Sequence, residues 1–124
     1  MYVQHNENPK GKNVGDCTIR AISLATDQSW DETYMGLALE GFVMGDMPSA
    51  NAVWGAYLKR KGFHREVVPD HDFYYTVADF ANDHAEGTFV LALSGHVVCI
   101  KDGNWMDSWD SGHEIPLYYW RKDE

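Results

Sequence analysis

The chain has 124 residues, of which 44% are hydrophobic and 14% aromatic, and its net charge is −9. This length and apolar content predict one domain, residues 1–124, that needs neither disulfides nor a structural metal. The acidic balance opposes binding to nucleic acids and to anionic lipids, and the longest apolar run, 89–93, is too short to span a bilayer. With two cysteines and no apolar signal-peptide core at the N-terminus, we expect a cytoplasmic protein.

The first predicted elements are an arm and a helix. Residues 1–12 are polar and include Pro9 and Gly11, which predicts an extended arm or loop. A helical pattern begins at Cys17, with Asp16 as the expected N-cap and Arg20 as a charge partner for that carboxylate.

Three further helices are predicted from polar residues at their starts. The capping signals are Ser29 with Glu32, Ser49, and Thr76 with Asp79. A strand is predicted at 63–68, before the last of these helices. From residue 88 onward the apolar period changes to two, which predicts strands at 88–93, 97–101, 104–107 and 115–120. The expected fold class is α+β, with an N-terminal helical half packed on a small C-terminal antiparallel sheet.

The dipeptide Asp102-Gly103 predicts a two-residue hairpin turn. Partners across that hairpin then have numbers that sum to 205, so His96 lies opposite Trp109, and Asp107 becomes a diagonal neighbour of His96 on the same face. Backbones of such neighbours are ~7–8 Å apart, within side-chain reach. A carboxylate there can hold the imidazole in one tautomer and stabilise its protonated form.

The register of this hairpin also determines the expected positions of two tryptophans and of a second carboxylate. Trp109 is expected to shield the His96–Asp107 contact from water, and Trp105, on the same face, is expected to line the cleft. A three-residue turn would instead place Asp110 opposite His96. We prefer Asp107, because Asp-Gly favours the shorter turn.

Cys17 is the candidate nucleophile. Backbone N–H groups and the helix dipole at a helix start favour a thiolate over a thiol, and a nucleophilic cysteine also needs a base. The alternative role is a buried core cysteine, which is the role we assign to Cys99 because it points to the other face of its strand.

The motifs Gly15-Asp16-Cys17, Gly95-His96 and Asp107-Ser108-Trp109 occur in the order Cys, His, Asp. In this order the chain resembles the papain-like cysteine peptidase superfamily, specifically the short forms encoded by phages and prophages. The resemblance implies a reduced papain-like fold, a polypeptide substrate, and the host cytoplasm as the location of a phage-encoded form. It also implies a triad of Cys17, His96 and Asp107, with the indole of Trp109 covering the His–Asp contact.

The family's oxyanion-hole Gln, six residues before the cysteine, is replaced here by Gly11. Asn13 is the expected side-chain donor, with Gln4 and Asn8 as alternatives and a plain turn role for Asn13 equally compatible. The backbone N–H of Cys17 would be the second donor.

We therefore expect a cysteine hydrolase that cleaves peptide or isopeptide bonds through a thioester. The alternatives are an acyl transferase or deamidase with the same triad, and a non-enzymatic acidic binding module. The net charge favours a basic polypeptide substrate. We expect no cofactor and no metal, because the sequence has neither a phosphate-binding Gly-rich loop nor zinc-type His and Cys spacing. The cluster Asp70-His71-Asp72 is interpreted as a solvated loop.

Overall fold

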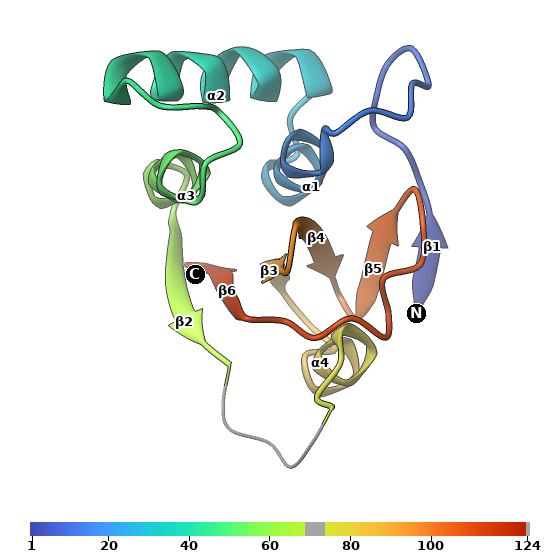
Figure 1. The fold of residues 1–124 in the computed structure, drawn as a ribbon. Helices are drawn as coiled ribbons and strands as arrows, with labels where there is room; N and C mark the ends of the chain where they lie inside the picture. The colour runs from blue at the N-terminus through green and yellow to red at the C-terminus, as the bar shows by residue number, and fades with distance from the viewer. Residues whose placement is uncertain (69–73, 124) are drawn as a thin grey trace.

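The computed structural model describes residues 1–68 and 74–123, which form a mixed α+β fold (Figure 1). The described helices are α1 (Cys17–Thr26), α2 (Trp30–Met44), α3 (Asn51–Arg60) and α4 (Val77–Asp83). The described strands are β1 (Tyr2–Gln4), β2 (Phe63–Val67), β3 (Thr88–Leu93), β4 (His96–Lys101), β5 (Asn104–Asp107) and β6 (Tyr118–Lys122). In this part of the chain no helix is long and apolar enough to cross a membrane.

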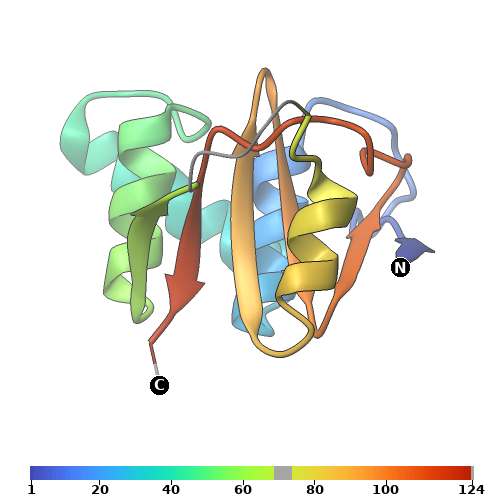
Figure 2. The same ribbon diagram turned by 90° about the horizontal axis from the view of Figure 1, so that it is seen from below.

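The six strands form one sheet in the order β1-β5-β4-β3-β6-β2. Helices α1 and α3 cover one face, and α2 lies across them as an outer layer (Figure 1). Helix α4 covers the opposite face, in front of the strands in Figure 2. The predicted α+β class is confirmed. The sheet is mixed rather than purely antiparallel, because β1 pairs in parallel with β5.

The N-terminal residues differ from the predicted arm, since Tyr2–Gln4 form β1. This strand pairs with β5 from Tyr2 opposite Trp105 to Gln4 opposite Asp107, and the His5 N–H donates to the Asp107 carbonyl at 2.8 Å. Three residues are too few to show a periodic pattern, and their partners lie about a hundred positions away. The consequence is that β5 is held on both sides up to its last residue.

Helix starts follow the capping signals in two of three cases. The Ser29 hydroxyl accepts the Glu32 N–H at 3.0 Å, and Thr76 with Asp79 forms a complete capping box. The prediction for Ser49 is wrong, because a turn closed by Ala50 N–H to Met47 carbonyl delays the helix and makes Ala50 the N-cap. The last strand also begins later than predicted, at 118 rather than 115, since Pro116 has no N–H for the ladder.

The hairpin between β4 and β5 has the predicted register, with Cys99 opposite Met106 and Lys101 opposite Asn104. The turn residues Asp102 and Gly103 have φ values of +48° and +79°, and a two-residue type I′ turn requires positive φ at both positions.

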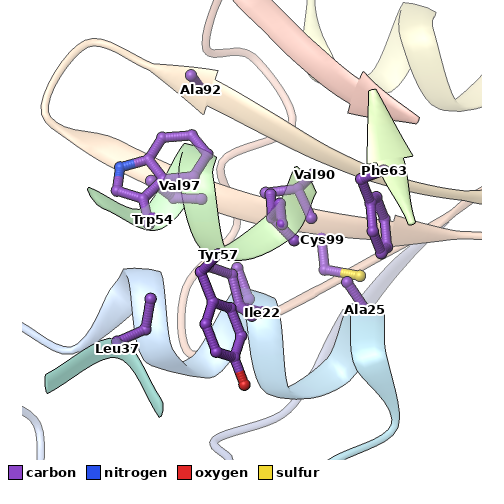
Figure 3. Close-up of a cluster of buried hydrophobic side chains, with 12 residues drawn as sticks. Ile22, Ala25, Leu37, Trp54, Tyr57, Phe63, Val90, Ala92, Val97 and Cys99 are labelled. Atoms are coloured by element: carbon purple, nitrogen blue, oxygen red, sulfur yellow. The ribbon is translucent and has the colours of Figure 1, made fainter. Parts of the chain in front are cut away.

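Side chains of the central strands alternate between two cores, one on each face of the sheet. The core between the helical layer and the sheet contains Ile22, Leu37, Trp54, Tyr57, Val90 and Cys99 (Figure 3). The core on the α4 face contains Phe80, Leu91, Val98, Ile100 and Trp105.

Candidate active site

Cys17 is the first residue of α1, and its free thiol is half-buried. Burial alone would raise the pKa of this thiol. Hydrogen bonding and charge from His96, with a backbone hydrogen bond from Val97 and a side-chain hydrogen bond from Thr18, outweigh burial and lower the pKa below its ordinary value. As the first residue of the helix, Cys17 also presents an N–H that has no acceptor within the helix.

His96 is the first residue of β4 and Asp107 is the last residue of β5, so both lie at the same end of these two neighbouring strands. The His96 Nε2 lies 2.5 Å from the Asp107 Oδ2, and both side chains are almost enclosed. Because Nε2 is used by the carboxylate, Nδ1 is the nitrogen left for the thiol. Asp110 is occupied elsewhere, since its Oδ1 accepts the Trp105 indole N–H at 2.9 Å. The carboxylate on the His96 ring is therefore the predicted one.

The two groups shift each other's protonation strongly. Burial would lower the pKa of His96, but hydrogen bonds and charge from Asp107 and Cys17 raise it to about 9. Burial would raise the pKa of the Asp107 carboxyl, but hydrogen bonds from His96 and Arg20 hold it below its ordinary value. At neutral pH this environment favours a thiolate beside an imidazolium whose far side is held by a carboxylate.

Arg20 connects this pair to the start of the helix. Its Nη1 donates to Asp107 Oδ1 at 2.5 Å and its Nε to Asp16 Oδ1 at 2.8 Å, although the residue is only 7% exposed. The Asp16–Arg20 pairing follows the prediction, whereas the Arg20–Asp107 contact was missed. No local signal was available for it, because Asp107 lies 87 positions away in the sequence.

Asp16 occupies the N-cap position, but its side chain does not cap the helix. Its carboxylate instead accepts hydrogen bonds from Arg20, from the Asn8 amide at 3.2 Å and from the Trp30 indole at 3.0 Å. This corrects the predicted cap, since three side-chain donors compete successfully with the backbone. Its charge is paired with Arg20, which limits its ability to raise the pKa of the neighbouring Cys17.

The two tryptophans have different positions. The Trp109 ring lies 4.7 Å from the His96 ring, centroid to centroid, and thus covers one side of the imidazole. Trp105 does not line the cleft and is corrected to a core residue. It lies two residues before Asp107 on β5, where residues on the α4 side of the sheet and the close backbone of Gly112 enclose it.

Of the three amides considered as oxyanion donors, two are engaged. Asn8 donates to Asp16, and Gln4 donates to the Ser108 carbonyl at 3.3 Å. Asn13 is exposed in the loop before α1. The Cys17 N–H is thus the donor that the fold itself positions.

Residues 1–68 and 74–123 contain no group of three or more His, Cys, Asp or Glu side chains that could hold a metal ion. The cluster Asp70-His71-Asp72 lies outside the described residues. Comparison with known proteins found no matching family model, no similar curated protein and no similar solved structure.

Proposed function

We propose that the protein is a cysteine hydrolase that cleaves peptide or isopeptide bonds, built as a reduced papain-like domain. The observation that carries this proposal is a set of contacts where α1 and β4 begin and β5 ends. A helix-start thiol with a lowered pKa meets an imidazole whose Nε2 is bonded to a buried carboxylate. This is the relation of nucleophile, base and orienting group that acyl transfer to a side chain requires.

In the first half of the reaction, the Cys17 thiolate attacks the carbonyl carbon and a C–S bond forms. The Cys17 N–H donates to the oxyanion. Collapse of the tetrahedral intermediate breaks the C–N bond, and the His96 imidazolium gives its proton to the leaving amine. The products of this step are a free amine and a thioester on Cys17.

In the second half, His96 takes a proton from a water molecule, which attacks the thioester carbonyl. The C–S bond breaks, a carboxyl product leaves and the thiolate is restored. Asp107 stabilises the imidazolium each time it forms, and Arg20 holds Asp107 in place through the 2.5 Å contact. Trp109 shields the His96–Asp107 bond from water, which strengthens that bond by lowering the local dielectric.

The test is digestion of a mixed peptide library at pH 7, read by mass spectrometry, together with an electrophilic cysteine probe. We expect new amine and carboxyl termini, and probe attachment at Cys17. The Cys17→Ala variant is the control and should lose both. Cleavage that persists in Cys17→Ala, or a folded protein that neither cleaves nor reacts with the probe, would contradict the proposal. Products in which an amine replaces water would reassign the same triad to acyl transfer.

A further inference from the structure

A cleft of about 720 Å³ lies at the start of α1, between the loop of residues 8–15 and the first turns of α1 and α2. Figure 1 shows this loop rising from β1 on the side where α2 begins. Gly15 and Asp16, the two residues before Cys17, are part of its lining. The apolar part of the lining consists of Val14, Ile19, Trp30 and Tyr34.

Both walls of the cleft are fixed to the same carboxylate oxygen. Asp16 Oδ2 accepts the Asn8 amide from the loop wall and the Trp30 indole N–H from the α2 wall. Asn8 in turn accepts the backbone N–H groups of Lys10 and Lys12 at 2.9 and 3.4 Å, which shapes the loop. The cleft is therefore preformed, as ligand sites usually are.

The apolar wall has an aromatic surface of suitable size for a side chain. The Trp30 and Tyr34 rings lie 5.1 Å apart, centroid to centroid, at an angle of 31°. Tyr34 is 48% exposed and Val14 is 50% exposed, so apolar surface is open to a ligand. A large apolar side chain placed there would remove this surface from water.

On one wall of the cleft the charge is positive, opposite in sign to the net charge of the chain. Lys10 and Lys12 are exposed on the loop wall, whereas Asp31 lies on the α2 wall. Asp16 is already paired with Arg20. The net charge of −9 acts on the encounter from a distance, but exposed charges beyond ~8–10 Å are screened at physiological ionic strength. Within the cleft, the loop lysines determine which neighbouring charge is favoured.

We propose that this cleft binds the substrate segment next to the scissile bond, with an aromatic or large aliphatic side chain against Trp30 and Tyr34. An adjacent acidic residue then faces Lys10 and Lys12. The inference rests on the proposed function for the position of the scissile bond. It replaces the preference for basic peptides, which the net charge alone predicts, by a local preference for an apolar–acidic pair.

The cleft is also connected to the catalytic groups. The Trp30 indole donates to Asp16, Asp16 binds Arg20, and Arg20 binds Asp107. A side chain that packs against Trp30 therefore contacts the outer end of the hydrogen-bond chain that holds Asp107. This gives the site a means to make reaction at Cys17 sensitive to occupancy of the cleft.

Binding can be measured without catalysis by using the Cys17→Ala protein and dye-labelled octapeptides in fluorescence anisotropy. Four peptides differ only at two central positions: Phe-Glu, Phe-Gln, Phe-Lys and Ala-Glu. We expect Phe-Glu to bind about tenfold more tightly than Ala-Glu, from burial of the ring. We expect the affinity to fall from Glu through Gln to Lys, with differences that shrink at high salt.

Two sets of variants locate the effect. Reversal of both loop charges, Lys10→Glu with Lys12→Glu, should invert the order of Phe-Glu and Phe-Lys. The control, Lys59→Glu with Lys122→Glu, makes the same change in net charge at exposed residues outside the cleft and should leave the order unchanged. Tyr34→Ala, at a half-exposed position, should weaken the Phe peptides and not Ala-Glu.

Equal binding of all four peptides, absence of binding to the folded protein, or inversion by the control pair would each overturn the inference. Failure of the proposed function gives a different result: Cys17 in the wild-type protein would show no enhanced reactivity toward the cysteine probe, while the peptide affinities could still follow the predicted order. The two outcomes are thus read from separate measurements.

Discussion

The two cysteines belong to the same side of the sheet but to different chemical environments. Cys99 lies within the core between α1 and the strands, with no exposed surface, and burial raises its pKa to about 12. Cys17 packs against the rim of that same core. There it meets His96 and the N-terminal end of α1, and its pKa is lowered. The hydrogen-bonding groups that lower the pKa of Cys17 are at the rim, whereas burial dominates at Cys99.

The difference indicates that the pKa of a cysteine in this fold depends on where the helix begins relative to the ends of β4 and β5. A cysteine placed two turns further along α1, beside Ala25, would pack against the apolar core. At the first residue, the same thiol has free N–H groups and an imidazole beside it. The four predictions below test this contrast, beginning with the largest expected effect.

The most direct test compares the two thiols in one native sample. At pH 7 we expect iodoacetamide to alkylate Cys17 at least ~10³-fold faster than Cys99, because thiolate content and access both favour Cys17. Peptide mapping by mass spectrometry at timed intervals gives both rates. Equal rates, or a faster Cys99, would remove the basis of the proposed mechanism.

The ionic network at the Cys17 side can be broken at Arg20. Arg20→Gln leaves Asp16 buried without a countercharge and Asp107 paired with His96 alone, so we expect a loss of roughly 3 kcal/mol in the free energy of unfolding. Lys101→Gln is the control. Its ion-pair partner Asp27 is 73% exposed, so the charge left behind is solvated and we expect about 1 kcal/mol or less. Urea denaturation at pH 7 measures both, and equal losses would show that the buried network has no special weight.

Serine substitution should affect stability far more at Cys99 than at Cys17. Cys99→Ser places a hydroxyl among apolar side chains, at an expected loss of about 1–3 kcal/mol. Cys17→Ser is expected to change stability by less than about 0.5 kcal/mol, because that position is half-buried beside polar partners. Thermal and urea unfolding of the two variants give the comparison. The contrast fails when Cys17→Ser is the less stable protein.

The smallest effect is in the pH dependence of Cys17 alkylation. Because the pKa of the Cys17 thiol is lowered, the thiolate forms at a lower pH than in an ordinary cysteine, and the alkylation rate first rises there. The thiolate then stays paired with imidazolium until His96 loses its proton near pH 9. Above that pH the unpaired thiolate has a higher basicity, and a thiolate gains about threefold in rate for each unit of pKa.

His96→Gln should therefore abolish the upper step and move the lower step to higher pH. The measurement is the rate of iodoacetamide alkylation from pH 5 to 10 in both proteins. A single step at the same pH in wild type and variant would show that the imidazole does not act on Cys17.

Local patterns were sufficient for much of the fold. The starts of α1 and α2, the bounds of β3 and β5 and the register of the hairpin all follow from capping residues, period-two alternation and one Asp-Gly turn. The contact between His96 and Asp107 follows in turn from that register. These features depend on interactions between residues that are close in the sequence, or related by a simple strand geometry.

Features that depend on distant partners could not be predicted. The pairing of β1 with β5, the contact of Arg20 with Asp107 and the hydrogen bond from Trp30 to Asp16 each require the packing of separate elements. Trp105 was placed on the correct face of β5, but coverage by α4 makes that part of the face interior. A strand pattern gives the side on which a residue lies and not what covers it.

The two-residue turn at Asp102-Gly103 makes the site depend on chain length at a point remote from it. Insertions in surface loops usually cost little free energy. One residue added here would shift every partner of β5 by one position and turn Asp107 toward the opposite face. A single codon inserted at the tip of this hairpin would then separate Asp107 from His96 without altering either side chain. The length of the turn is as much a part of the candidate active site as the thiol.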